Sequence, residues 1–246
     1  MKFGLIGYPL THSFSKKYFD AKFISLGLAG FTYQNFSLNK IGDIIPILAG
    51  DLLGLNVTIP YKSAVIDYLD EIDHDAEEIG AVNTLVQIEN SKWKGFNTDG
   101  TGFKFSLENW IGENLYPEKA LILGSGGAAK AIKHALFALG IQPAIVSRGN
   151  DGDYSYDNLT PEVIGSNLLI INASPLGMSP QENTFPPIPY EALSQNHWLY
   201  DVVYNPTNTL FLARGEQMGA HTKNGLEMLH LQAEQAWVIW KTYGRF

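Results

Sequence analysis

The chain has no cysteine, few positive charges and no long apolar segment. Without cysteine, its 246 residues form neither disulfides nor thiolate metal sites, so we expect an intracellular, cytoplasmic protein. Seventeen Lys and Arg against 25 Asp and Glu give a net charge of −8, which argues against nucleic acids and anionic membranes as partners. No apolar run is long enough to cross a membrane, and residues 1–10 lack the features of a signal peptide.

Apolar strands alternate with helical segments over residues 1–99. The segments "FGLIG", "FTYQNFSL" and "GLNVTIP" are typical of strands, and "FSKKYFDAKFISLG" predicts a helix with Phe14, Tyr18, Phe19 and Phe23 near one face. Pro60 is expected to open a helix at its favoured first-turn position. Residues 81–99 predict a hairpin with its turn at residues 89–92.

Residues 100–223 repeat the alternation more regularly. The expected strands are "KALILG", "QPAIVS", "NLLIINAS" and "WLYDVVYN", with helices between them, which is typical of a parallel, doubly wound sheet. The Pro-rich residues 179–193 predict a surface loop. Residues 225–244 predict one amphipathic helix with an apolar stripe of Leu226, Leu229, Ala233, Trp237 and Trp240.

A dinucleotide fingerprint follows the first strand of this second region. Gly124, Gly126 and Ala129 fit the pattern G-x-G-x-x-G/A between an apolar strand and a helix, where a pyrophosphate rests on the helix N-terminus. Because the fingerprint begins a second domain, residues 1–99 form a domain of their own, which is the natural place for a substrate. The fold class is therefore α/β with two domains.

The end of the next strand predicts which dinucleotide binds. NAD sites carry Asp or Glu there to accept a hydrogen bond from the ribose 2′-hydroxyl, whereas this chain offers Ser147 and Arg148. An arginine can bind a 2′-phosphate through two parallel bonds, which favours NADP. In the alternative, Arg148 is a solvated loop residue and Asp151 binds NAD.

Three polar segments each follow a predicted strand of the first domain: "HSFS" (12–15), "NVTIPYK" (56–62) and "NTDG" (97–100). Ligand groups collect at such positions in an α/β sheet. Singly, each has a structural explanation, since Ser13 and Asp99 are suitable helix caps, Asn56 and Thr58 are suitable turn residues, and Lys62 suits an exposed helix surface. Together, beside a dinucleotide loop, they indicate a substrate site.

The ordered set "HSFS", "NVTIPYK", "GAVNTL", "NTDG", "GSGGAAKA", "NASPLGM", "DVVYNP" and "NGLEMLHLQA" resembles the shikimate dehydrogenase family over nearly the whole chain. The resemblance implies reversible reduction of 3-dehydroshikimate to shikimate by NADPH, on the way to chorismate and the aromatic amino acids. It implies a Rossmann-like NADP-binding domain over residues 100–223. Residues 1–99 would form the substrate domain, completed by the last helix within residues 224–246.

The resemblance also implies the residues of the site. The substrate carboxylate would bind Ser13 and Ser15, and Tyr204 would lie near the ring. The residues expected around the ring hydroxyls are Thr58, Lys62, Asn83, Asp99 and Gln232. The residues expected at the cofactor are Gly124, Ser125, Gly126, Gly127, Ala128, Ser147, Arg148, Asn172 and Gly225.

The chain departs from the family at three points. Lys16 stands where the family commonly has proline. The family's Asn-Arg-Thr segment is here Ser147-Arg148-Gly149, followed by acidic residues that leave Arg148 as the phosphate ligand. The chain is also somewhat short for the family.

Hydride transfer between a nicotinamide and a carbonyl or alcohol carbon leaves one proton to be delivered or accepted. Without a metal, a lysine can handle this proton while an adjacent carboxylate orients it and the hydroxyl, so Lys62 and Asp99 are the predicted catalytic pair. Whether Lys62 transfers the proton itself or stabilises charge while water delivers it stays open. No metal is expected, because the six histidines show no ligand spacing.

Two alternatives to an NADP-dependent shikimate dehydrogenase remain. One is an enzyme that also takes quinate, with NAD. The other is a non-catalytic sensor of shikimate-like acids and a nucleotide on the same fold. We expect a monomer or a homodimer with a small-molecule substrate.

Overall fold

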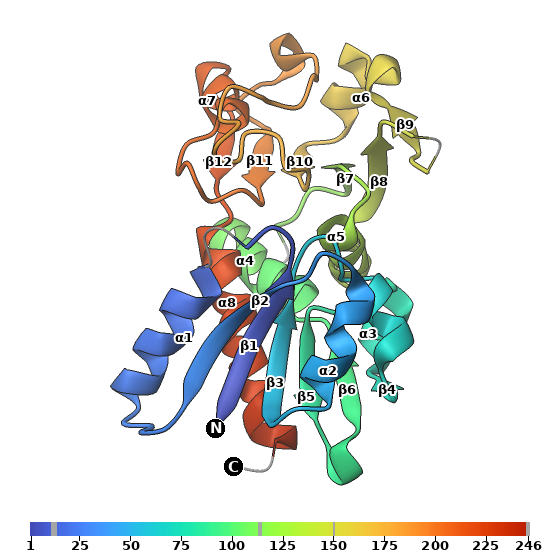
Figure 1. The fold of residues 1–246 in the computed structure, drawn as a ribbon. Helices are drawn as coiled ribbons and strands as arrows, with labels where there is room; N and C mark the ends of the chain where they lie inside the picture. Colours follow the sequence, from blue (N-terminus) through green and yellow to red (C-terminus); the bar gives the residue numbers. More distant parts are fainter. Residues whose placement is uncertain (11–13, 113–114, 150, 245–246) are drawn as a thin grey trace. The chain divides into compact units, whose positions relative to one another are not determined.

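The computed structural model describes residues 1–10, 14–112, 115–149 and 151–244, which fall into two compact units (Figure 1). Unit 1 comprises Met1–Thr98 with Ala233–Phe246, and unit 2 comprises Asp99–Gln232. The expected first boundary after residue 99 differs by one residue. The second boundary falls within the last helix and not at residue 223, because Met228 belongs to the apolar core of unit 2.

Unit 1 is a six-stranded mixed sheet in the order β2-β1-β3-β5-β6-β4. Its strands are β1 (Lys2–Gly7), β2 (Thr32–Ser37), β3 (Leu52–Val57), β4 (Glu71–Ile72), β5 (Thr84–Gln87) and β6 (Trp93–Phe96). Its helices are α1 (Phe14–Ser25), η1 (Ile41–Ile44), α2 (Ile45–Leu48), η2 (Ala64–Tyr68), α3 (His74–Ile79), η3 (Glu89–Ser91) and the second half of α8 (Leu226–Tyr243).

The strand pairing brings several chain segments to one edge of this sheet. Strand β1 lies between β2 and β3 and runs parallel to both, whereas β5 is antiparallel to β3 and to β6. Asn56 near the end of β3 therefore pairs with Thr84 at the start of β5, and Thr84 pairs with Phe96 at the end of β6. The residues that follow β3, precede β5 and follow β6 consequently meet at the same edge.

An aromatic core covers one face of the unit 1 sheet. Trp240 of α8 is fully buried, and its ring centroid lies 4.7 Å from that of Phe3 and 5.0 Å from that of Phe19. Its Nε1 donates a hydrogen bond to the carbonyl of Leu85 at 2.9 Å. The indole lies over Gly54 of β3, where a Cβ atom would be only 2.4 Å from Nε1. Glycine is therefore required at residue 54 for the last helix to dock.

The opposite face of that sheet carries a second apolar cluster, which includes Ile44, Val65 and Ala76 from η1, η2 and α3. Leu5 and Ile6, which are neighbours in β1, contribute to the aromatic and the second cluster respectively. This alternation is what a strand covered on both faces requires.

Unit 2 is a six-stranded sheet in the order β12-β11-β10-β7-β8-β9, and all of its strand pairs are parallel. Its strands are β7 (Lys119–Leu123), β8 (Gln142–Ser147), β9 (Tyr154–Ser155), β10 (Leu169–Asn172), β11 (Trp198–Asp201) and β12 (His221–Lys223). Its helices are α4 (Asp99–Ile111), α5 (Gly127–Ala138), η4 (Tyr156–Asn158), α6 (Pro161–Ser166), η5 (Tyr190–Ala192), α7 (Leu210–Gln217) and the start of α8.

Both faces of the unit 2 sheet are buried. Ala120 and Ile122 of β7 pack in one cluster with residues of α4, α5 and α8, whereas Leu121 and Leu123 pack in another with residues of α6 and α7. Strand β7 has β8 on one side and β10 on the other, so the strand order reverses beside it. In open parallel sheets, ligands bind at the carboxyl ends of the strands at this reversal. The predicted α/β class with a parallel, Rossmann-like second sheet is confirmed.

Four local expectations differ from the structure. Pro60 lies in a turn, and the helix that follows is the short η2, which begins at Ala64. The predicted surface loop at residues 179–193 has buried Ile188 and Tyr190 in the core of unit 2. The apolar stripe of α8 holds for Ala233, Trp237 and Trp240, but Leu226 is exposed. The short strands β4, β9 and β12 were not predicted, because two or three mixed residues show no period-two pattern.

No helix in the described part of the chain is long and apolar enough to cross a membrane.

Replacing Gly54 by alanine tests the docking of Trp240. A Cβ atom there would overlap a rigid, fully buried indole, so we expect Gly54→Ala to lower the free energy of unfolding by about 1–3 kcal/mol. Gly42→Ala is the matched control, because a Cβ atom at residue 42 would meet only the Tyr68 hydroxyl at 3.8 Å. The measurement is denaturant unfolding followed by tryptophan fluorescence. Equal stability of the two variants would show that the indole moves aside without cost.

Candidate active site

Four of the eight residues predicted around the substrate lie in segments at the edge of unit 1 where the strand ends meet. Ser15 is the second residue of α1, Thr58 directly follows β3, Lys62 lies in the turn beyond it, and Asn83 directly precedes β5. Ser13 lies outside the described residues. Pairing of β3 with β5 brings the segments that carry Thr58 and Asn83 together, although 25 residues separate them in the chain.

Thr58 is held by the strand beside it. Its N–H donates to the carbonyl of Ile6 at 2.9 Å, and its carbonyl accepts from the N–H of Tyr61 at 3.0 Å. A Cβ atom at Gly7 would be 2.4 Å from the Thr58 methyl carbon. Glycine at the end of β1 is therefore what leaves room for this threonine.

Lys62 is half-buried in a turn that is anchored at two points. Its carbonyl accepts a hydrogen bond from the N–H of Val82 at 2.7 Å, and the hydroxyl of the preceding Tyr61 donates to the carbonyl of Leu38 at 2.6 Å. Lys62 is therefore not a lysine on an exposed helix surface, which was the alternative to a role in the site. Backbone bonds fix the base of its side chain at this edge.

Asn83 is 3% exposed and lies at the centre of a hydrogen-bonded network. Its Oδ1 accepts from the N–H of Thr98 at 2.8 Å and from the hydroxyl of Thr84 at 3.0 Å, and its Nδ2 donates to the hydroxyl oxygen of Thr98 at 3.0 Å. Asn83 thereby fixes the backbone of Thr98, the residue immediately before Asp99. Its contact with a substrate stays a prediction.

The network continues across the unit 1 sheet to Ser15. The Nδ2 of Asn56 donates to the carbonyl of Asn83 at 3.4 Å and to the hydroxyl oxygen of Thr84 at 3.3 Å, so its Oδ1 faces the other way. There it accepts from the hydroxyl of Tyr33 at 2.7 Å, and Tyr33 also shares a hydrogen bond with the side chain of Ser15. Burial raises the pKa of Tyr33 well above its ordinary value, so its hydroxyl stays protonated. Asn56 lies within β3, so it is not a turn residue.

In unit 2, the glycine loop after β7 is in contact with the backbone after β10. Gly124 has a φ of 122°, and a Cβ atom there would lie 3.2 Å from backbone atoms of Ala173 and Ser174. The N–H of Gly124 donates to the carbonyl of Val146 at 2.8 Å, and the N–H of Ala173 donates to the carbonyl of Leu123 at 3.0 Å. Conformation and space together require glycine at residue 124.

The start of α5 is suited to an anion. Gly126 is its N-cap residue, a Cβ atom there would meet no described atom within 4 Å, and the first turn of the 12-residue helix has no acidic residue. The N–H groups of the first helical turn have no partner within the helix, and their dipoles favour negative charge. Ala129 is fully buried in the sheet-facing core, which allows helix and strand to pack closely. The predicted Gly124, Ser125, Gly126, Gly127 and Ala128 therefore form one continuous cradle that fits a pyrophosphate.

The residues after β8 combine one positive and one negative charge. Ser147 ends β8, is 3% exposed, and donates from its hydroxyl to Oδ1 of Asp151 at 2.6 Å. Asp151 also shares a hydrogen bond with the side chain of Ser125, and these bonds lower the pKa of Asp151. Arg148 is exposed. Burial raises the pKa of the Tyr156 hydroxyl above its ordinary value, and the positive charge of Arg148 offsets part of this rise.

Asn172 and Asp201 end the neighbouring strands β10 and β11, and both are fully buried. Nδ2 of Asn172 donates to Oδ1 of Asp201 at 3.0 Å and to the carbonyl of Leu176 at 3.1 Å, and its Oδ1 accepts from the N–H and hydroxyl of Ser174. All four hydrogen-bonding positions of the amide are occupied. In this structure the Asn172 side chain shapes the loop after β10, and its contact with a cofactor stays a prediction.

Asp201 was not among the predicted site residues. Its Oδ2 accepts from the Thr209 hydroxyl at 2.5 Å, and its Oδ1 accepts from the N–H of Val203 at 2.9 Å. Burial outweighs these bonds and raises its pKa from 3.8 to about 7. An apolar strand that ends in a single aspartate is the only sequence signal for it, and aspartates commonly end strands at turns.

The other predicted residues of unit 2 belong to α4, to α8, to the segment after β11 and to the turn between β12 and α8. Asp99 is the first residue of α4 and is 6% exposed, and Tyr204 is half-buried. A Cβ atom at Gly225 would lie 2.1 Å from the carbonyl oxygen of Val202, so this position requires glycine. Nε2 of Gln232 donates to the carbonyl of Leu229 at 2.9 Å. The structure brings Gly225 beside the end of β11.

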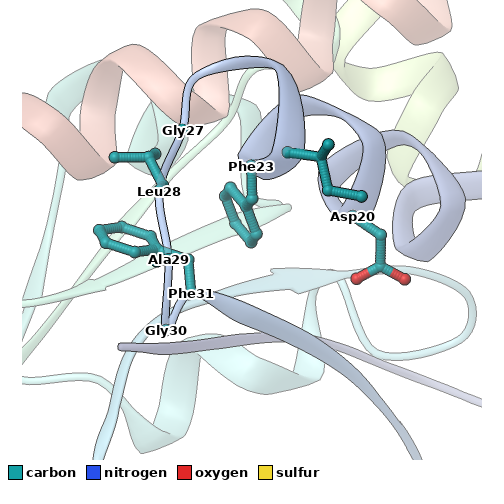
Figure 2. Close-up of a pocket in the computed structure, with 8 residues that line it drawn as sticks. Asp20, Phe23, Gly27, Leu28, Ala29, Gly30 and Phe31 are labelled. Atoms are coloured by element: carbon teal, nitrogen blue, oxygen red, sulfur yellow. The ribbon is translucent and has the colours of Figure 1, made fainter.

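A shallow pocket lies elsewhere in unit 1, between the end of α1 and the loop to β2 (Figure 2). Phe23, Leu28 and Phe31 give it mostly apolar walls, with the carboxylate of Asp20 at its rim. None of the predicted site residues that the structure describes is among those that line it.

Known proteins are similar to this chain in sequence and in structure over nearly its whole length. Residues 5–85 match the family described as the shikimate dehydrogenase substrate binding domain. A Staphylococcus epidermidis protein named shikimate dehydrogenase (NADP(+)) is 37% identical over 98% of this chain and 92% of its own length. A curated relative of the same name from Desulforamulus reducens is 34% identical over 96% of this chain and 88% of its own.

Solved structures that are similar to this chain carry the same enzyme name as these relatives. A crystal structure of a shikimate dehydrogenase in complex with NADP+ has a TM-score of 0.84 and 33% identity, and covers 99% of this chain and 91% of its own. A Listeria monocytogenes shikimate 5-dehydrogenase in complex with shikimate and NAD has the same TM-score, 30% identity, and coverage of 99% and 92%.

The buried carboxyl of Asp201 predicts a pH-dependent stability. Its pKa is higher in the folded than in the unfolded chain, so the folded state holds the extra proton, and stability falls as pH rises from about 4 to about 7. An amide at this position carries no such proton. We therefore expect the difference in unfolding free energy between Asp201→Asn and wild type to shift in favour of the variant across that range.

The measurement is denaturant unfolding at several pH values, with the exposed Asp157→Asn in the same unit as control. A difference between Asp201→Asn and wild type that stays constant from pH 4 to pH 8 would contradict a raised pKa.

Proposed function

The chain belongs to the shikimate dehydrogenase family, and we propose that Lys62 and Asp99 form the catalytic pair of its reaction. The reaction is the reversible reduction of 3-dehydroshikimate to shikimate with NADPH, a step of the shikimate pathway. The assignment of this reaction and cofactor is carried by similarity over nearly the whole chain, at 34–37% identity, to relatives named shikimate dehydrogenase (NADP(+)). The glycine cradle and the polar edge of unit 1 support it.

The cofactor, when bound, supplies the hydride that adds to the carbonyl carbon of the substrate. Gly124 to Ala128, at the start of α5, would hold its pyrophosphate through backbone N–H groups. Arg148 would bind the 2′-phosphate as an exposed guanidinium beside this loop. Asn172 and Gly225 are proposed to lie against the cofactor through the backbone segments that they shape.

The substrate is proposed to bind through groups that suit a small hydroxylated acid. Ser13 and Ser15 would donate hydroxyl hydrogen bonds to its carboxylate. Thr58, Asn83, Tyr204 and Gln232 offer hydroxyl and amide groups for its ring hydroxyls, and Asn83 has a position fixed by its own network. Four of these six residues belong to unit 1, whereas Tyr204 and Gln232 belong to unit 2, to which we also assign cofactor binding.

Lys62 and Asp99 have distinct parts in the proposed chemistry. As hydride reaches the carbonyl carbon, negative charge builds on the carbonyl oxygen, and that oxygen must gain one proton to become the hydroxyl. The ammonium group of Lys62 would stabilise this charge and supply the proton, directly or through water. Asp99 would orient the lysine and accept a hydrogen bond from a substrate hydroxyl.

We also propose that the enzyme is cytoplasmic, that it is a monomer or a homodimer, and that small molecules are its only partners.

A sensor on the same fold has no need for a proton-transfer pair. Purified protein is therefore offered shikimate or quinate, each with NADP+ or NAD+, and formation of reduced nicotinamide is followed by its absorbance. Turnover establishes the enzyme, and no turnover in any of the four combinations would favour the sensor.

Substitution of the two serines tests substrate binding. Hydroxyls that bind a carboxylate interact equally with ground and transition states, so Ser15→Ala and Ser13→Ala should each raise KM for shikimate with little change in kcat. The expected loss is about 1.5–3 kcal/mol for each hydrogen bond to a charged group. Ser25→Ala, at the far end of α1, is the control. A normal KM in both variants would limit these serines to a structural role.

Substitution of the proposed pair tests the chemistry. Lys62→Ala should lower kcat by roughly 10²–10⁴, the usual contribution of positioned acid–base catalysis, while shikimate and NADP+ still bind. Asp99→Asn should lower kcat and also raise KM, because Asp99 would contact the substrate as well as the lysine. The double variant should lose less activity than the product of the two single losses, because the residues act together.

Steady-state kinetics and ligand titration of the three variants decide between these outcomes, with Lys40→Ala as a control for an exposed lysine of the same unit. A near-normal kcat for Lys62→Ala would remove the lysine from the chemistry. Fully multiplicative losses in the double variant would mean that the residues act independently.

A further inference from the structure

The carboxylate of Asp151 lies beside the ends of two neighbouring strands, β7 and β8. Its Oδ1 accepts a hydrogen bond from Ser147 at the end of β8, at 2.6 Å, and its carboxylate also bonds to Ser125 in the glycine loop after β7. These are two neighbouring strand ends of the parallel sheet. The ribose of a dinucleotide whose pyrophosphate rests on the start of α5 extends towards the end of the second strand, which here is β8.

The loop is folded so that the carboxylate reaches this position. A Cβ atom at Gly149 would be 3.0 Å from Oδ1 of Asp151, and the Ser147 hydroxyl also lies 3.1 Å from the Gly149 carbonyl. A Cβ atom at Gly152 would be 2.9 Å from the carbonyl oxygen of Ile145 in β8. Glycines on both sides of Asp151 therefore let the loop fold tightly against the strand and leave room for the carboxylate.

The neighbouring Asp153 has a different role. Its Oδ2 accepts from the backbone N–H of Ile145 at 2.8 Å, so it holds the loop to β8. The carboxylate of Asp151 is held by the hydroxyls of Ser147 and Ser125 and by a backbone N–H of its own residue. Asp153 therefore ties the loop to β8, whereas the carboxylate of Asp151 lies among serine hydroxyls beside the glycine loop, where a ligand hydroxyl would be one more donor.

We propose that Asp151 determines cofactor choice, accepting a hydrogen bond from the free 2′-hydroxyl of NAD(H) and disfavouring the 2′-phosphate of NADP(H), so that this enzyme uses NAD(H) as well as NADP(H). The inference rests on the proposed function for the identity of the ligand. A carboxylate is a good acceptor for a ribose hydroxyl but repels a phosphate dianion at short range. The two serine hydrogen bonds lower its pKa, which keeps it charged at neutral pH.

Arg148 opposes this effect. Its guanidinium is exposed, and its charge is felt at the Tyr156 hydroxyl of the segment that follows the loop. The chain therefore presents one group suited to a 2′-phosphate and one suited to a 2′-hydroxyl within the same short loop. Opposite charges a few residues apart lead to a small preference between the two cofactors.

The test measures binding and turnover separately in wild type, Asp151→Asn and Arg148→Leu. Dissociation constants for NADP+ and NAD+ are obtained from quenching of the protein's tryptophan fluorescence, and kcat/KM values with shikimate are obtained for each cofactor. Asp157→Asn is the matched control, because it removes an exposed carboxylate from the same unit.

Wild type should bind both cofactors. Asp151→Asn should change the ratio of the NADP+ and NAD+ dissociation constants in favour of NADP+ by about tenfold, the equivalent of about 1.4 kcal/mol. Arg148→Leu should change that ratio in the opposite direction, because it weakens NADP+ binding and leaves NAD+ binding nearly unchanged. Asp157→Asn should leave the ratio as in wild type.

An unchanged ratio in Asp151→Asn, or an equal change in Asp157→Asn, would overturn the inference, as would wild type that does not bind NAD+. A different result would contradict the proposed function. In that case wild type would bind both cofactors but would not turn over shikimate with either of them.

Discussion

Parallel pairing of apolar strands is the constraint on which the rest of this structure depends. A strand that is buried on both faces has no place for polar side chains along its length, so these groups collect where the strands end. In unit 2 all strand pairs are parallel, and the glycine cradle, Ser147, Asn172 and Asp201 therefore lie at a common edge. In unit 1 one antiparallel strand, β5, brings the start of one segment to the ends of its neighbours.

Polar groups that are buried at these edges are paired, and their pairing determines which of them can meet a ligand. The amides of Asn83 and Asn172 each make several hydrogen bonds within their own unit, so their main contribution is to fix the loops around them. Lys62 carries its charge on a long side chain in a turn that is anchored by hydrogen bonds, and Arg148 carries its charge on an exposed side chain. Under the proposed function, the hydrogen-bonded amides would hold the loops from which these charged groups act.

The sequence predicts the larger elements of the fold well and the finer parts of the site less well. Strands such as Lys119–Leu123 and the long helix Leu226–Tyr243 follow from their apolar periodicity, and Gly124 and Gly126 follow from fingerprint spacing. The short strands, the turn at Pro60 and the burial of Ile188 depend on tertiary contacts that local patterns do not encode. Sequence spacing favours Asp151 only as an alternative, because its hydrogen bonds come from Ser147 at the end of β8 and from Ser125 in the glycine loop, which only the tertiary structure brings together.

The proposed function requires that shikimate bind at the edge of unit 1 and that the dinucleotide bind at the start of α5. A crystal structure with both shikimate and NADP+ tests it most directly. We expect the pyrophosphate to lie on the N–H groups of Gly126 to Ala128 and the shikimate carboxylate to lie on Ser15. Nζ of Lys62 should lie within about 3.2 Å of the reacting hydroxyl oxygen or be joined to it by one water. A substrate bound away from Ser15 and Lys62, or a dinucleotide bound away from the start of α5, would contradict it.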